Sequence, residues 1–77
     1  MSYIIIVFKN THDAMNAETI ILEKNIKIRI MPTPTSITQS CGICVRIETR
    51  ELLDEILKLD FEYKSIYQRG EEGYIII

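Results

Sequence analysis

The chain has 77 residues, 47% of them hydrophobic and 26% charged, which suits one small domain and excludes catalytic machinery spread over two lobes. Nine Lys and Arg residues against eleven Asp and Glu residues give a net charge of −2 without a basic stripe, so we expect no nucleic-acid partner. The longest apolar run, residues 4–8, is far shorter than the ~20 residues that span a bilayer, and no cleavable leader pattern accompanies it. We therefore expect a cytoplasmic protein without a membrane partner.

The first half of the chain predicts a strand, a helix and a second strand. Residues 3–8 are apolar at every position, as in a strand covered on both faces. A helix is expected next, with Thr11 as its N-cap and Asp13 in its first turn, and it should end near residues 24–25. Residues 26–30 alternate between isoleucine and a basic residue, which is typical of a half-buried strand at a sheet edge.

The second half of the chain predicts one long loop, two further strands and a second helix. Residues 32–42 hold both prolines and show no period, so they are expected to form a loop of functional importance. Residues 43–47 alternate as a strand, and residues 63–68 are a fourth strand candidate. Between them Thr49 is expected to cap a second helix. The apolar stripe of this helix consists of Leu52, Leu53, Ile56, Leu57 and Leu59.

The order of these elements, βαββαβ, predicts an α+β fold: a ferredoxin-like two-layer sandwich with an antiparallel sheet over residues 1–70. Residues 71–77 form a tail that is expected to add a strand in a hairpin with strand four. The first strand is apolar on both faces, and two helices cover only one of them. A homodimer is therefore expected through the open sheet face or through the C-terminal strand.

The direction of the elements brings chemically useful residues to one end of the sheet. Strand one runs toward the start of the first helix, strand two runs to the same end, and the long loop with Cys41 follows it. A helix N-terminus offers N–H groups and partial positive charge to a thiolate, and His12 could add a cation or accept a proton. Gly42 lets a ligand approach the backbone. A reactive cysteine in such a loop suits a sulfur or selenium carrier, which forms a persulfide or selenosulfide.

Three motifs support this interpretation: residues 9–15, the Pro-x-Pro stretch in residues 31–34, and the Ser-Cys-Gly at residues 40–42. Over about residues 3–69 the chain resembles the Se/S carrier protein-like family of small bacterial domains. The resemblance implies that Cys41 is the carrier thiol and that the partners are donor and acceptor proteins. We expect a covalent carrier without turnover of its own. The candidate site consists of Cys41 and His12, with Thr11, Pro34, Ser40 and Gly42 around them.

Two other functions stay open. Cys41 and Cys44 form a C-x-x-C, the spacing of a dithiol redox protein or of half a zinc site, but here it runs into a strand instead of opening a helix. Two thiols and a single histidine are too few for zinc unless two chains share it, so we expect no metal and no cofactor. Cys44 should face the open side of the sheet, where a dimer could cover it. The fold also suits a non-catalytic interaction or regulatory module.

Overall fold

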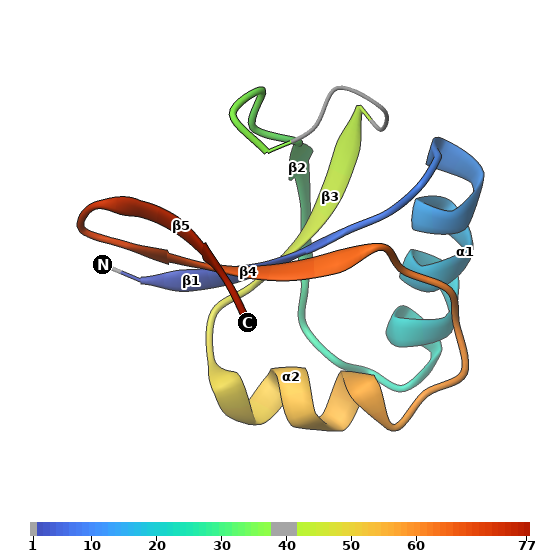
Figure 1. The fold of residues 1–77 in the computed structure, drawn as a ribbon. Coiled ribbons are helices and arrows are strands. Elements are labelled where there is room, and N and C mark those ends of the chain that lie inside the picture. Colours follow the sequence, from blue (N-terminus) through green and yellow to red (C-terminus); the bar gives the residue numbers. More distant parts are fainter. Residues whose placement is uncertain (1, 38–41) are drawn as a thin grey trace.

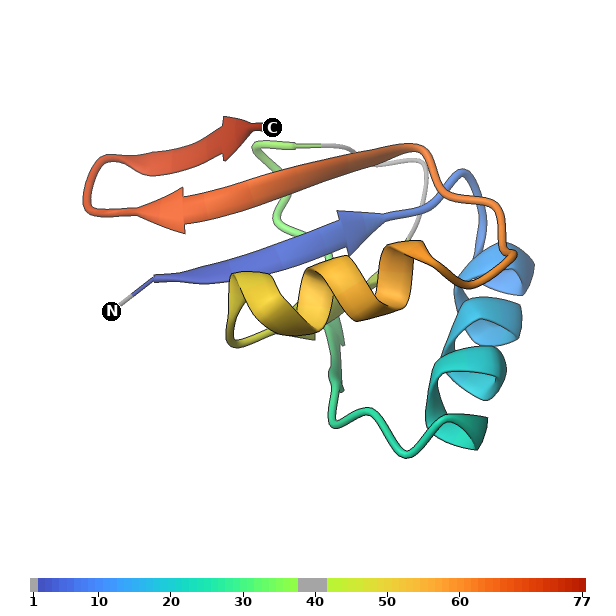
Figure 2. The same cartoon turned by 90° about the horizontal axis from the view of Figure 1, so that it is seen from below.

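Residues 2–37 and 42–77, which the computed structural model describes, form an antiparallel sheet of five strands with two helices on one face (Figure 1). The elements are β1 (Tyr3–Val7), α1 (Thr11–Glu23), β2 (Arg29–Pro32), β3 (Ile43–Ile47), α2 (Arg50–Leu57), β4 (Ser65–Gly70) and β5 (Gly73–Ile76). Figure 2 shows both helices on the same side of the central strands. No helix in this part of the chain combines the length and the apolar character that crossing a membrane requires.

The strand order is β2-β3-β1-β4-β5, with every neighbouring pair antiparallel. β1 lies in the centre, where Ile6 is opposite Val45 of β3 on one side and Ile66 of β4 on the other. The first four strands have the ferredoxin-like arrangement that the sequence predicts, and β5 extends the sheet beyond β4 as a hairpin. The predicted fold class and the extra C-terminal strand are thus confirmed.

The main core lies between the sheet and the two helices. Alternate residues of β1 point toward this side, and Phe8 directly after the strand joins them. Ala14, Ala17 and Ile21 of α1 pack there because they recur at helical spacing, and all three are fully buried. From α2, the buried residues are Leu53 and Ile56. Leu57 was expected in the same apolar stripe, but its side chain is 42% exposed. It is the last residue of α2 and lies outside the side of the helix that faces the core.

The opposite face of the sheet has a small core of its own, which corrects the prediction of an open face. Ile5, Val7 and Cys44 have no exposed surface there. A turn in the long loop, closed by a 3.0 Å hydrogen bond from the Ile37 amide to the Pro34 carbonyl, brings Ile37 onto this cluster. The other side chains packed against it are Tyr3, Met31, Tyr67 and Tyr74. Cys44 points away from the helices as predicted, but this single chain already buries it.

Two strands are displaced from their predicted positions. β2 begins at Arg29 instead of residue 26, because Asn25 takes a left-handed conformation (φ 59°) after α1 and residues 26–28 serve as a connection. Ile26 and Ile28 still pack against the main core, which explains the alternation seen in the sequence. β2 is an edge strand as expected. β4 covers Ser65–Gly70 instead of residues 63–68, in register with β1.

The helix caps differ in how well the sequence predicts them. Asn10, not Thr11, is the N-cap of α1: its Oδ1 accepts a 2.8 Å hydrogen bond from the Asp13 amide, so the prediction of Thr11 is wrong. Thr11 is the first helical residue instead. Asparagine is at least as good a cap as threonine, and Asn10 itself has the extended backbone that a cap needs (φ −156°, ψ 169°). Thr49 caps α2 as predicted, accepting from the Leu52 amide at 3.2 Å.

Candidate functional site

The register of the sheet defines the end at which the candidate cysteine loop begins and closes. Val7, the last residue of β1, is paired with Cys44 near the start of β3. Four residues later, at Thr11, the chain enters α1. The base of the loop is closed by the pair Pro32 and Ile43, and by a 3.2 Å hydrogen bond from the Thr33 amide to the Gly42 carbonyl. The loop ends and the approach to α1 therefore share one end of the sheet, as the sequence predicts.

Two of the predicted site residues, Ser40 and Cys41, lie outside the described residues. Their neighbour Gly42 is exposed, and a Cβ added to it would meet nothing within 4 Å. Pro34 is half-buried and accepts the hydrogen bond that forms the Ile37 turn. The described neighbours of Gly42 therefore leave open space on the side where a side chain would point.

Thr11 and His12 form the exposed first turn of α1. The cap side chain of Asn10 binds the Asp13 amide, and the Ala14 amide binds the Asn10 carbonyl at 3.3 Å. Within residues 2–37 and 42–77 the amides of Thr11 and His12 have no such partner, as is usual at a helix start. These amides can bind an anion, although the Asp13 carboxylate in the same turn opposes it.

Cys44 has a different environment from that of an exposed redox thiol. Its side chain is fully buried in the cluster with Ile5 and Val7, and its sulfur lies 4.0 Å from the Pro32 carbonyl oxygen. Such packing keeps reagents in the solvent from reaching this sulfur while the sheet is folded. Among the described residues, no three His, Cys, Asp or Glu side chains gather in a way that could hold a metal ion.

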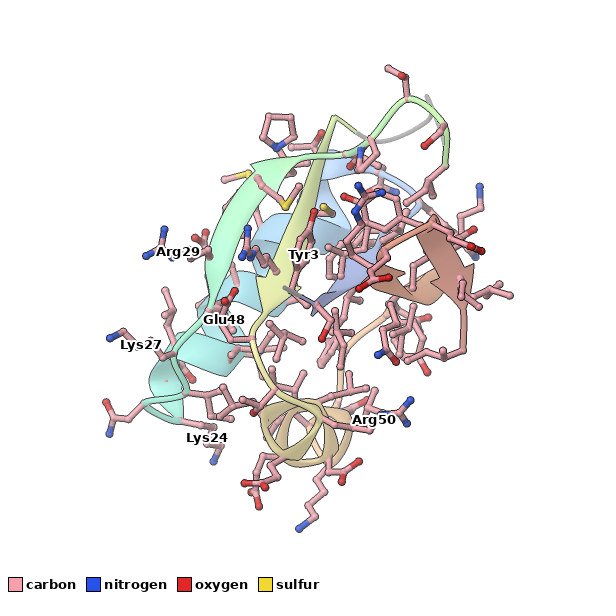
Figure 3. The ribbon with its side chains drawn as sticks, turned by 90° about the vertical axis from the view of Figure 1, so that its left-hand side faces the viewer. Tyr3, Lys24, Lys27, Arg29, Glu48 and Arg50 are labelled. Carbon is pink, nitrogen blue, oxygen red and sulfur yellow. The ribbon has the colours of Figure 1, made fainter. Side chains whose placement is uncertain are left out.

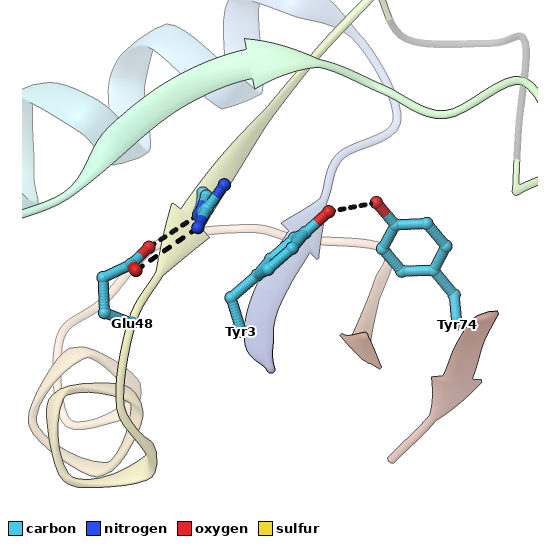
Figure 4. Close-up of polar contacts among 4 residues, drawn as sticks. Tyr3, Glu48 and Tyr74 are labelled. Carbon is cyan, nitrogen blue, oxygen red and sulfur yellow. Dashed lines mark hydrogen bonds and ion pairs between the residues drawn. The ribbon is translucent and has the colours of Figure 1, made fainter. Parts of the chain in front are cut away.

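A polar cluster that the sequence analysis missed lies on the same face as Cys44 (Figure 4). The hydroxyl oxygens of Tyr3 and Tyr74 are 2.6 Å apart. The guanidinium of Arg46 stacks 3.9 Å above the centre of the Tyr3 ring, and it donates to both carboxylate oxygens of Glu48 at 2.6 and 3.3 Å. The period of two along each strand places Tyr3 and Arg46 on defined faces, but only the pairing of strands brings them together.

The hydrogen bonds of this cluster shift the ionisation of its members. The bond from Arg46 lowers the pKa of Glu48, and the same bond raises the pKa of Arg46. Burial, followed by the hydrogen bond with Tyr3, raises the pKa of Tyr74 from 10.0 to about 12. At neutral pH, Glu48 is therefore a carboxylate and Tyr74 a neutral phenol.

The fold and the loop define a ferredoxin-like α+β domain with a cysteine in the long connection between β2 and β3. The sequence profile of the family described as "Putative Se/S carrier protein-like" matches residues 3–68. The chain belongs to this family, as its motifs indicate. Membership of a carrier family implies interaction with other proteins. The match runs from β1 into β4 and ends before β5.

Another comparison gives an uncharacterised protein of Methanocaldococcus jannaschii, which is 36% identical over 63 residues. The matched part covers 80% of this chain and 30% of that protein, so the chain spans about a third of the length of this curated relative. No solved structure gives a significant match to the chain.

Proposed function

We propose that the protein is a covalent carrier that holds sulfur or selenium on Cys41. The observation that carries the proposal is the family match over residues 3–68, a range that includes the Ser-Cys-Gly motif. Burial of Cys44 supports it too, because the other thiol of the chain is then unsuited to the same role. The carrier receives its cargo from a donor protein and passes it to an acceptor protein, without catalytic turnover.

The transfer step is a thiolate exchange that needs no outside oxidant. The Cys41 thiolate attacks the outer sulfur of a persulfide on the donor, the S–S bond of the donor breaks, and the donor cysteine leaves as a thiolate. The product is a persulfide on Cys41. The same balance holds for selenium, in which case a selenosulfide forms. Transfer to the acceptor repeats the step in the other direction, and Cys41 returns to the thiolate.

The residues around the loop have proposed supporting roles. The open amides of Thr11 and His12 are suited to stabilising a thiolate, and the imidazole of His12 can add a positive charge or accept a proton. Pro34 shapes the described arm of the loop, Gly42 leaves space for a partner, and Ser40 is a hydroxyl beside the thiol in sequence. The shared sheet end supports these assignments, since the loop base and the approach to α1 meet there.

Mass spectrometry of the protein after incubation with a persulfide donor tests the proposal. Both cysteines fall on one tryptic peptide, between Arg29 and Arg46, so fragment spectra and variants must assign the added atom. We expect one added sulfur on Cys41 in the wild type and in Cys44→Ala, and none in Cys41→Ser. A mass gain that survives in Cys41→Ser, or its absence with several donors, would contradict the carrier function. A disulfide between the two cysteines would instead support the dithiol alternative.

The proposed setting is the cytoplasm, and the proposed assembly is a homodimer. A chain with only two cysteines, one of them buried in the sheet, is suited to a reducing compartment. The C-terminal strand supports dimerisation better than the sheet face does, because Ile75 and Ile76 on the edge strand β5 are each 63% exposed. Analytical ultracentrifugation tests this: the wild type should sediment as a dimer and Ile75→Lys as a monomer. A monomeric wild type would refute it.

A further inference from the structure

A cationic cavity lies beside the β2–β3 edge, away from the sheet end at which the cysteine loop is closed. It has a volume of about 400 Å³, within the range of about 300–1,000 Å³ typical of small-ligand sites. Its lining residues are Lys27, Ile28, Arg29, Arg46 and Glu48. Figure 3 shows Lys27, Arg29 and Glu48 on one side of the molecule, with Tyr3 next to them. The motifs that carry the family resemblance, at residues 9–15, 31–34 and 40–42, include none of these lining residues.

The charge of the cavity is opposite to that of the chain. Its three cations and one carboxylate give +2, whereas the whole chain carries −2. Of the three cations that line the cavity, only Arg46 has an ion-pair partner in the described part of the chain, namely Glu48. Lys27 and Arg29 are exposed and make no salt bridge within those residues. The cavity thus holds more positive charge than its own acidic group can neutralise.

The pairing of β2 with β3 places two of the cavity's positive charges side by side, where their repulsion destabilises the folded state. Arg29 of β2 is directly opposite Arg46 of β3. Like charges at directly opposed positions destabilise an antiparallel pair. Glu48 relieves part of the repulsion, because its carboxylate binds Arg46 and also feels the charge of Arg29. The remainder is a cost that a bound anion would remove.

Arg46 is held in place for binding. Its guanidinium is fixed by two hydrogen bonds to Glu48 and by stacking on the Tyr3 ring, at 3.9 Å. Two of the five N–H groups of the guanidinium are used in this way, which leaves three for a ligand. A planar guanidinium with free N–H groups matches the paired oxygens of phosphate or carboxylate. Because the side chain is already ordered, binding costs little side-chain entropy.

We propose that this cavity binds a phosphomonoester group, with Arg29, Arg46 and Lys27 as its cationic ligands. The charge favours phosphate over a single carboxylate: a phosphomonoester carries about −1.5 to −2 at neutral pH, which matches the net +2 of the lining. The volume leaves room for more than the phosphate itself. The group could belong to a small phosphorylated metabolite or to a phosphoserine of a partner protein, and the chemistry of recognition is the same.

Amide NMR titration of the full chain with O-phosphoserine tests the proposal, with chloride at equal ionic strength as the reference. We expect saturating shifts at residues 27–29 and 46–48, and at least a tenfold weaker affinity in Arg29→Gln and in Lys27→Gln. Lys64→Gln removes the same charge from an exposed site on another part of the surface and should leave the affinity unchanged. Non-saturating shifts, or equal weakening in Lys64→Gln, would overturn the proposal.

Thermal unfolding gives a second readout that does not depend on the proposed carrier function. Phosphoserine should raise the melting temperature of the wild type and of Cys41→Ser, because a ligand of the folded state stabilises it. It should not raise that of Arg29→Gln. No increase in the wild type would refute the site. A phosphoserine peptide that binds more tightly than the free amino acid would identify a protein partner, and equal affinity would identify a metabolite.

Discussion

The hydroxyl oxygens of Tyr3 and Tyr74 lie 2.6 Å apart, although 71 positions separate the two residues along the chain. Tyr3 begins β1 and Tyr74 lies in β5, and the bond joins these two strands across β4. The rings also meet edge to face, with their centres 6.2 Å apart. β5 lies beyond the family match, so this contact ties a strand outside the matched range to the central strand of the sheet.

Removing the Tyr74 hydroxyl should weaken the fold measurably. In Tyr74→Phe the ring contacts remain but the bond to Tyr3 is lost, and we expect the free energy of unfolding to fall by about 1 kcal/mol. Urea denaturation followed by circular dichroism measures this. Tyr63→Phe is the matched control, since Tyr63 is 41% exposed and its hydroxyl makes no hydrogen bond in the described part of the chain. Equal losses in the two variants would show that the bond contributes nothing.

Alkaline pH should remove the same stabilisation. The folded state raises the pKa of Tyr74 from 10.0 to about 12, chiefly through burial. The folded protein therefore holds this proton more tightly than the unfolded chain does, and the stabilisation is complete below pH 10 and is lost as the pH rises toward 12. The stability difference between wild type and Tyr74→Phe should shrink over this interval. A difference that stays constant to pH 12 would contradict the shift.

Cys44 should be protected from alkylation in the folded protein. Its side chain has no exposed surface, so a reagent reaches it only when the sheet opens. With iodoacetamide and mass readout, Cys44 should react slowly in buffer and rapidly in concentrated urea. In the Cys41→Ser variant Cys44 is the one remaining cysteine, so all alkylation is assigned to it. Rapid modification in buffer would mean that the cluster with Ile5 and Val7 opens readily, and it would revive the dithiol alternative.

The two candidate caps of α1 can be separated by a pair of alanine substitutions. Asn10→Ala removes the side-chain oxygen that binds the Asp13 amide, and we expect a loss of about 1 kcal/mol. Thr11→Ala changes an exposed first-turn residue to the best helix former, so stability should change by less than about 0.5 kcal/mol. Thermal or urea unfolding compares them. A larger loss in Thr11→Ala would reverse the assignment.

Several elements could be predicted because their signals are local. β1 is apolar at every position and is indeed buried on both faces. The Thr49 cap and the end of the first helix near residues 24–25 follow from the preferences of single residues, and both are confirmed. The predicted edge position of the second strand is also correct, since its basic residues require contact with water.

Predictions failed where two neighbouring sequence positions offer similar local energies. Asn10 and Thr11 can both cap a helix, and the backbone that enters α1 favours the first. The alternation of residues 26–30 is typical of a strand, but β2 begins only at Arg29. Ile26 and Ile28 account for the alternation because they pack against the main core from the connection that precedes β2. For the candidate site, the shared sheet end follows from connectivity. The cationic cavity does not, because it depends on the register that sets Arg29 against Arg46.

Composition, periodicity and motif spacing were sufficient to predict the fold class, the order of the elements and the family. Each of these depends on local hydrophobic patterns or on short motifs, which can be recognised in the sequence. The second core around Cys44, the Tyr3–Tyr74 bond and the cavity at Arg29 required the folded chain. They arise from pairing between segments far apart in sequence, and a shift of one residue in that pairing would turn each side chain to the other face of the sheet.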